Sequence, residues 1–178
     1  MPIFIDSQSL HSSTRLALTA LEWLEDRIEP QTILDIGCGN GILSLTASHI
    51  WGGRVLACDI SPNAIADIQA NIAQFAPESD ITVLRSDGVK HPTIKQTAPF
   101  ELIIGNLLAQ WQVAMAQDFR TLITSQGVIL LSGILVWQID SIRDAFHAAN
   151  FHIIQEFNDG EWCCLVLQNK SPHPSSYC

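Results

Sequence analysis

Apolar and polar positions along this chain follow two alternating patterns. Leu16, Leu18, Leu21 and Leu24 recur near helical spacing, with polar residues on the other face, and this pattern predicts a first helix over residues 11–28. Short apolar runs, typical of strands buried on both faces, then alternate with longer segments that have a helical pattern. The predicted strands are 32–36, 54–58, 81–84, 100–105 and 128–131, and the predicted helices between and after them are 41–51, 61–75, 110–124 and 137–150.

Turn and cap residues support these boundaries. Ser12, Ser13 or Thr14 is expected to cap the first helix, and Ser61-Pro62 is a helix start with Pro at the first helical position. Residues 91–99 are predicted as a polar connection or a short helix, and 125–127 as a turn. Near the end, Asp159-Gly160 separates two β-rich runs at 151–157 and 161–167, which predicts an antiparallel hairpin.

Strands that alternate with helices predict an α/β fold with a doubly wound, mostly parallel sheet. The hairpin adds two strands, so we expect a seven-stranded sheet with a C-terminal antiparallel hairpin. With 178 residues the chain is long enough for one domain, expected at 1–170, and residues 171–178 are expected to form a flexible tail.

Composition narrows the class of protein. Apolar residues make up 47% and charged residues 15%, as in a packed globule. We find no signal peptide and no apolar run of membrane length, and therefore expect a cytoplasmic monomer without a membrane partner. The formal net charge of −9 argues against a nucleic-acid partner. This charge suits a basic protein or an amine substrate, or it serves only solubility.

The cysteines and histidines show no metal-binding pattern. Five cysteines occur without CxxC spacing, and their odd number in a cytosolic context favours reduced thiols. The six histidines are scattered. We therefore expect neither disulfides nor a metal site.

Polar and glycine residues gather where the predicted strands end. Asp35 precedes Gly37, Gly39 and Gly41 at the end of the first strand. Ligands of open α/β sheets bind at the carboxyl ends of the strands, so this edge is the predicted site. The later strands end at Asp59, Asp87, Asn106 and Ser132-Gly133.

The spacing of the glycines selects among nucleotide ligands. A dinucleotide fingerprint needs a third glycine at position 42, which is Ile42, and the chain has no P-loop motif. The spacing G-x-G-x-G, with Asp59 ending the next strand, fits S-adenosylmethionine. Asp59 would then accept hydrogen bonds from both ribose hydroxyls, and Asp87 or its neighbour would meet the adenine amino group.

Longer motifs make a family resemblance specific. They are HSSTRLALTALEWLE, ILDIGCGNGIL, IIGNLLA, and LLSGIL followed by EWC, and they span residues 11–167. With these motifs the chain resembles the catalytic domain of the family that methylates ribosomal protein L-eleven. The resemblance implies a Rossmann-like class I methyltransferase fold and an S-adenosylmethionine-dependent N-methyltransferase acting on a protein amine, either lysine or an α-amino group.

The resemblance also implies roles for single residues. Thr14 would contact the cofactor near its amino-acid end, Gly37 would offer backbone to it, and Asn106 would stand at the catalytic position where the methyl group meets the amine. A neutral amine attacks directly, so most of the rate would come from orientation. We expect no general base. The full set of expected cofactor-binding residues is Thr14, Asp35, Gly37, Cys38, Gly39, Gly41, Asp59, Ile60, Asp87 and Asn106.

The chain also departs from the family pattern. Residues 7–9, Ser-Gln-Ser, stand where the family has GTG, and an N-terminal domain that grips the ribosomal protein precedes the catalytic domain in the family. Residues 106–109 lack the aromatic of the NPPY motif, which argues against glutamine or adenine methylation. Two alternatives stay open: a small-molecule methyltransferase whose pocket is built from 1–14 and 133–138, and a cofactor-binding domain without catalysis.

Each candidate residue also has a purely structural interpretation. The glycines would serve tight packing, and the polar candidates would be ordinary caps or turn residues. Trp111 is expected to pack in the core rather than line a substrate pocket, and His11 is expected to be structural or solvated. The residues with a cap or turn alternative are Thr14, Asp59, Asp87, Asn106 and Ser132.

Overall fold

The computed structural model describes residues 10–169 and confirms the predicted fold class. Seven strands form one sheet in the order β3-β2-β1-β4-β5-β7-β6. The strands are β1 (Thr32–Ile36), β2 (Arg54–Asp59), β3 (Ile81–Arg85), β4 (Phe100–Asn106), β5 (Ile123–Leu135), β6 (Phe151–Asp159) and β7 (Trp162–Asn169). The helices are α1 (Ser12–Glu25), α2 (Ile42–Trp51), α3 (Pro62–Phe75), α4 (Pro92–Thr97), α5 (Ala109–Leu122), η2 (Val136–Gln138) and α6 (Ile139–Ala148).

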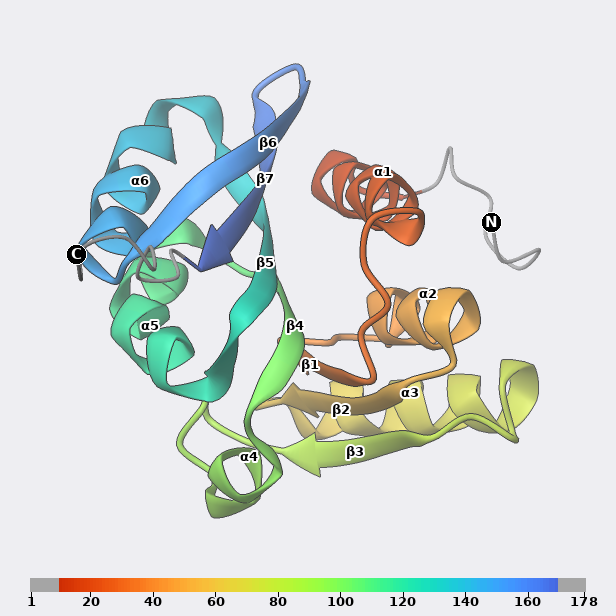
Figure 1. The fold of residues 1–178 in the computed structure, drawn as a ribbon. Helices are drawn as coiled ribbons and strands as arrows, with labels where there is room; N and C mark the ends of the chain where they lie inside the picture. Colours follow the sequence, from red (N-terminus) through yellow and green to blue (C-terminus); the bar gives the residue numbers. More distant parts are fainter. Residues whose placement is uncertain (1–9, 170–178) are drawn as a thin grey trace.

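The first five strands run parallel, whereas β7 pairs antiparallel with both β5 and β6. The predicted hairpin is therefore confirmed, and its second strand is inserted between β5 and β6. Figure 1 shows α1 and α2 on one side of the sheet and α5 and α6 on the other. The carboxyl ends of the parallel strands meet at one edge, where the sequence places the site.

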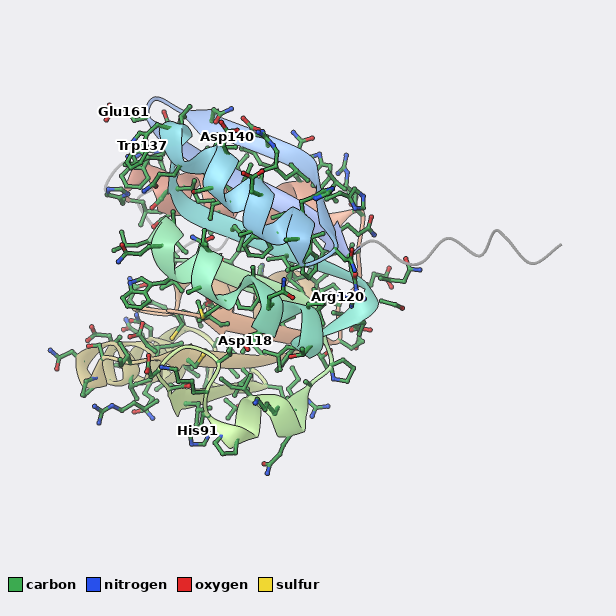
Figure 2. All side chains as sticks on the ribbon, turned by 90° about the vertical axis from the view of Figure 1, so that its left-hand side faces the viewer. His91, Asp118, Arg120, Trp137, Asp140 and Glu161 are labelled. Carbon is green, nitrogen blue, oxygen red and sulfur yellow. The ribbon has the colours of Figure 1, made fainter. Side chains whose placement is uncertain are left out.

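Alternate residues of the central strands bury their side chains in two cores. Leu102 and Ile104 of β4 pack in the core beneath α1 and α2, whereas Ile103 packs with Phe119 and Phe146 beneath α5 and α6. This two-sided burial explains why the strands read as continuous apolar runs. The solvent face of the second layer carries polar side chains, such as those of Asp118 and Asp140 (Figure 2).

Some predicted boundaries are wrong. Residues 125–127, predicted as a turn, belong to the 13-residue strand β5, which continues through a register shift that lies between Phe100 and Leu102 on β4. The cap of α1 is His11 and not one of the three following residues, because the His11 Nδ1 accepts the Ser13 amide at 3.4 Å. The predicted helix at 137–150 begins as a short 3₁₀ turn, and its α-helical part starts only at Ile139.

Several expectations fall on residues outside the described range. They are the substitution at 7–9 and the flexible tail at 171–178. The expectation of a single domain over 1–170 stays a prediction. In the described part of the chain, no helix has both the length and the apolar character that crossing a bilayer requires.

Candidate functional site

The end of β2 clamps the turn that follows β1. Asp59 is the last residue of β2, and its Oδ2 accepts the Gly39 amide at 3.0 Å. Its Oδ1 accepts the Ser61 amide at 2.8 Å, at the start of α3. Each oxygen keeps a second lone pair for a further donor. Asp59 therefore helps to start α3, as its structural interpretation holds, and it can still accept hydrogen bonds from a ligand.

The three glycines of the turn have different surroundings. Gly37 and Gly41 have φ of +72° and +85°, and an added Cβ would lie 2.2 Å from Leu107 Cδ2 and 2.3 Å from Ile68 Cγ1, respectively. A Cβ on Gly39 would meet no heavy atom within 4 Å. Two glycines are thus required by tight packing, whereas Gly39 borders open space.

The amide groups of this turn are satisfied within the chain. Gly37 and Cys38 both donate to the Cys58 carbonyl, at 2.8 and 3.1 Å, and Gly41 donates to the Cys38 carbonyl at 2.8 Å. With Gly39 held by Asp59, these four groups are not directed at a ligand. Phosphate-binding turns present such amides to the anion, so this turn suits a ligand without a phosphate.

Asp35 is a buried carboxylate beneath the turn. Ser44 of α2 donates its hydroxyl to Asp35 Oδ2 at 2.5 Å, whereas the buried Oδ1 finds no hydrogen-bond partner among the described residues. Burial raises the pKa of Asp35 from 3.8 to about 6, and the Ser44 hydrogen bonds oppose this rise. An unpartnered buried carboxylate oxygen is costly, and a ligand cation at this position would compensate that cost.

Thr14 and Asn106 meet on the other side of the site. Thr14 lies in the first turn of α1, and Asn106 ends β4. The Asn106 Nδ2 donates to Thr14 Oγ1 at 3.3 Å, although 92 residues separate them. The clash that a Cβ on Gly37 would make with Leu107 shows that the glycine turn and the residue after Asn106 are in contact. The structure therefore brings both candidate groups to one edge of the sheet.

The remaining candidates lie at the periphery. Ile60, directly after Asp59, is 60% exposed, as a residue that packs against a flat ligand would be. Asp87 is exposed and forms an ion pair with Lys90 at 2.6 Å. The Cys38 side chain is buried and packs with Ala57 and Ile68.

The thiols are suited to packing and not to catalysis. Within the described residues Cys38, Cys58, Cys163 and Cys164 are buried and form no disulfide. Burial raises the pKa of the Cys58 thiol to about 12 and raises that of Cys38 further above its usual range. A thiol held protonated is a poor nucleophile. No group of three or more potential metal ligands occurs within residues 10–169.

Sequence reasoning missed two features of the site. The Gln112 side chain is fully buried and donates hydrogen bonds to carbonyls of the β4–α5 loop and of β5, although it is not among the predicted site residues. Its position on the buried stripe of α5, between Ala109 and Ala116, was the available signal. Trp111 is 56% exposed, so the expected core packing is wrong, because the polar Gln112 and not Trp111 occupies the inward position.

Comparison with known proteins agrees with this geometry. A family model described as ribosomal protein L11 methyltransferase (PrmA) matches residues 9–170. The chain belongs to this family. A ribosomal protein L11 methyltransferase of Gloeobacter violaceus is 30% identical over 166 residues, covering 93% of this chain and 50% of that protein. One of Legionella pneumophila (strain Paris) is 33% identical over 162 residues, covering 90% and 52%. The chain therefore spans about half the length of the curated relatives it matches.

Solved structures of methyltransferases share the fold. A ribosomal protein L11 methylase from Lactobacillus delbrueckii subsp. bulgaricus superposes with a TM-score of 0.82 at 27% identity, covering 90% of this chain and 80% of the other. A precorrin-6y C5,15-methyltransferase from Geobacter metallireducens superposes with a TM-score of 0.72 at 14% identity, covering 92% and 91%. The second likeness concerns the fold alone.

Proposed function

We propose that this chain is the catalytic part of an S-adenosylmethionine-dependent N-methyltransferase that acts on a protein amine. Ribosomal protein L11 is the first candidate substrate, on the strength of the family. The observation that carries the proposal is the pairing of Thr14 with Asn106 at the same sheet edge as the glycine turn and Asp59. This edge supplies hydrogen-bond acceptors and an open backbone surface, and its Cys38 thiol is buried, which keeps it protonated.

The residues present fit the cofactor. S-adenosylmethionine, when bound, supplies a methyl group activated by a sulfonium and carries an ammonium group. Asp35 has a free buried oxygen for a cation, Asp59 can accept from two ribose hydroxyls, and Gly39 leaves room at the turn. Ile60 and the segment at Asp87 would border the adenine.

Asn106 would orient the acceptor amine. Its Nδ2 donates to Thr14, so its Oδ1 is left to accept a hydrogen bond from an amine N–H, and such a bond would direct the nitrogen lone pair. Positioning of this kind can supply most of the rate of a direct displacement. The amine must be neutral, and this is easier for an α-amine with a pKa near 8 than for a lysine near 10.4.

Exposed apolar side chains beside Asn106 offer a contact surface for the acceptor. Leu108 is 62% exposed and Trp111 56%, both within five residues of Asn106. Trp137, which follows β5, is 77% exposed, and Figure 2 shows it at the same corner as Asp140 and Glu161. An apolar side chain next to the carboxylates of Asp140 and Glu161 suits a basic protein segment, in line with the net charge of −9.

A direct test measures cofactor binding and methyl transfer separately. Calorimetric titration with S-adenosylmethionine should show binding to the wild-type chain. Transfer of labelled methyl groups to purified ribosomal protein L11 is then compared with transfer to lysate metabolites. Absence of binding would contradict the proposal, binding with transfer only to metabolites would favour the small-molecule alternative, and binding without any transfer would favour a non-catalytic domain.

Substitutions on the two sides of the site should separate binding from turnover. Asp59→Ala is expected to weaken S-adenosylmethionine binding by about 2 to 3 kcal/mol, the scale of charged hydrogen bonds. Asn106→Ala is expected to lower kcat about a hundredfold and to weaken S-adenosylmethionine binding much less than Asp59→Ala, because orientation of the amine is its main proposed role. Calorimetry and initial rates check both. Unchanged affinity in Asp59→Ala would remove this residue from the cofactor site.

A further inference from the structure

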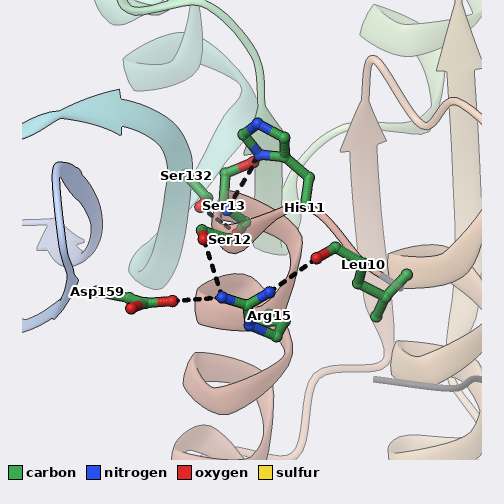
Figure 3. A network of polar contacts seen from close by, with 7 residues as sticks. All are labelled: Leu10, His11, Ser12, Ser13, Arg15, Ser132 and Asp159. Atoms are coloured by element: carbon green, nitrogen blue, oxygen red, sulfur yellow. Dashed lines mark hydrogen bonds and ion pairs between the residues drawn. The ribbon is translucent and has the colours of Figure 1, made fainter. Parts of the chain in front are cut away.

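A closed series of hydrogen bonds surrounds Asn106. The Asn106 amide donates to Thr14, and the Ser132 hydroxyl of β5 donates to the carbonyl of Ser13, the residue before Thr14, at 2.7 Å (Figure 3). Gln112 of α5 donates to the Ser132 carbonyl at 2.6 Å and to the Leu107 carbonyl at 2.5 Å. Leu107 follows Asn106 in the chain, so the series returns to its starting point. We call these residues the polar ring: Ser13, Thr14, Asn106, Leu107, Gln112 and Ser132.

Gln112 joins the two segments that flank the catalytic position. Its two amide hydrogens reach carbonyls of the β4–α5 loop and of β5, and its side chain is inaccessible to solvent. Both partners are carbonyl oxygens, so only the amide nitrogen can face them. Its Oε1 has no partner within the described residues, so Gln112 acts in the ring purely as a double donor.

The backbone of β5 is shaped to allow this closure. Ser132 and Gly133 lie within a register shift between β5 and β7, as bulged strands often do beside a site. Gly133 has a φ of +75°, and a Cβ there would lie 2.7 Å from the Leu107 carbonyl and 3.1 Å from Asn106 Oδ1. A larger residue would separate β5 from the β4–α5 loop and open the ring.

We infer that Gln112 is a positioning residue that sets the orientation of the Asn106 amide through the polar ring. Gln112 holds the Leu107 carbonyl directly after Asn106, Ser132 pairs with Asn106 across β4 and β5 and bonds to Ser13, and Thr14 holds the amide itself. The assignment rests on the proposed function for its kinetic consequence, whereas its structural consequence concerns this chain alone. A purely structural Gln112 would affect stability and leave the Asn106 amide as it is.

The kinetic test uses Gln112→Met, which keeps the length of the side chain and removes both donors. Per folded molecule, kcat for methylation of ribosomal protein L11 is expected to fall about ten- to a hundredfold, while the KM for S-adenosylmethionine stays within about threefold. The matched control is Gln117→Met, an exposed glutamine on the same helix, which should change neither quantity. A loss of folded protein with unchanged kcat per folded molecule would overturn the inference.

The structural test needs no substrate. Nuclear magnetic resonance should find the Gln112 side-chain amide of the wild type protected from hydrogen exchange, because it is buried and doubly bonded. In Gln112→Met and in Ser132→Ala, the Asn106 side-chain amide is expected to shift and exchange faster, with no such change in Gln117→Met. An Asn106 signal that is the same in all variants would contradict the ring. If wild type methylates no protein, the proposed function fails while this test still decides the role of Gln112.

Discussion

The two sides of the site are built in different ways. One side, the local half, comprises residues 35–61 with Asp35, the glycine turn and Asp59, and its hydrogen bonds join residues that are near in sequence. The other side, the assembled half, is the polar ring. Thr14 and Asn106 are 92 residues apart, and Ser13 and Ser132 are 119 apart.

This difference shows which part of a site a short sequence motif can specify. Asp35, the glycine turn and Asp59 of the local half lie within one continuous strand–turn–helix–strand segment, β1 to β2, so the glycine spacing and two aspartates almost specify it. The assembled half exists only after α1, β4, β5 and α5 have packed around the sheet edge. Binding of the cofactor and orientation of the acceptor can therefore be perturbed separately.

The largest expected loss of stability comes from a substitution that disrupts the contact between the two halves. Gly37→Ala would place a Cβ against Leu107 in a left-handed conformation, and we expect it to lower the free energy of unfolding by about 2 to 5 kcal/mol. Gly39→Ala is the matched control, since its φ is also positive but its Cβ would meet open space. It should cost about 1 to 2 kcal/mol, from backbone conformation alone. Urea unfolding measures both, and equal losses would contradict the tight contact with Leu107.

The next effect concerns Asp35 in the local half. Its pKa rises from 3.8 to about 6, so between these values the native state holds a proton that the unfolded chain has released. Stability relative to Asp35→Asn should therefore be highest below pH 4 and fall by about 3 kcal/mol as the pH rises through 6.

Urea unfolding of the wild type and of Asp35→Asn across this pH range checks the prediction. The other carboxylates titrate alike in the two proteins, so their contributions cancel in the difference between the two unfolding free energies. A difference that does not vary with pH would mean that Asp35 is not desolvated. Bound S-adenosylmethionine should reduce the loss above pH 6 if its ammonium meets Asp35.

The smallest loss of stability is expected for Arg15, which connects α1 to the end of β6. Arg15 donates to Asp159, the last residue of β6, at 2.6 Å and to Ser12 at 2.9 Å (Figure 3). The Arg15 and Asp159 side chains are 38% and 46% exposed, so solvent screens the pair. Arg15→Ala should cost less than about 1 kcal/mol in thermal or urea unfolding. A loss in kcat as large as that of Gln112→Met would show that the assembled half extends to the hairpin.

Sequence patterns predicted the order and type of the elements, because strands buried on both faces of a parallel sheet form continuous apolar runs in the sequence. Element boundaries differ from the prediction where tertiary pairing extends an element. The sequence predicts a turn at Gly127, yet β5 runs through it because the strand continues beside β4. His11 caps α1 with a ring nitrogen, a choice that the three hydroxyl residues after it concealed.

The sequence also did not predict which side chain of α5 points into the core. Trp111 and Gln112 are adjacent on α5, and hydrophobicity alone would bury the tryptophan. In the structure Gln112 is buried because its amide donates to the Leu107 and Ser132 carbonyls. Leaving a buried carbonyl without a hydrogen bond would cost more free energy than exposing the Trp111 ring.

The sequence by itself determined the sheet, the glycine turn and the place of Asp35 and Asp59, because these depend on local periodicity and on conformations that glycine favours. Only the tertiary structure decided how Thr14 meets Asn106 and how Gln112 and Ser132 support them. The Thr14–Asn106 and Ser13–Ser132 contacts join residues 92 and 119 apart, so they depend on the packing of whole elements, and no short stretch of the chain contains them.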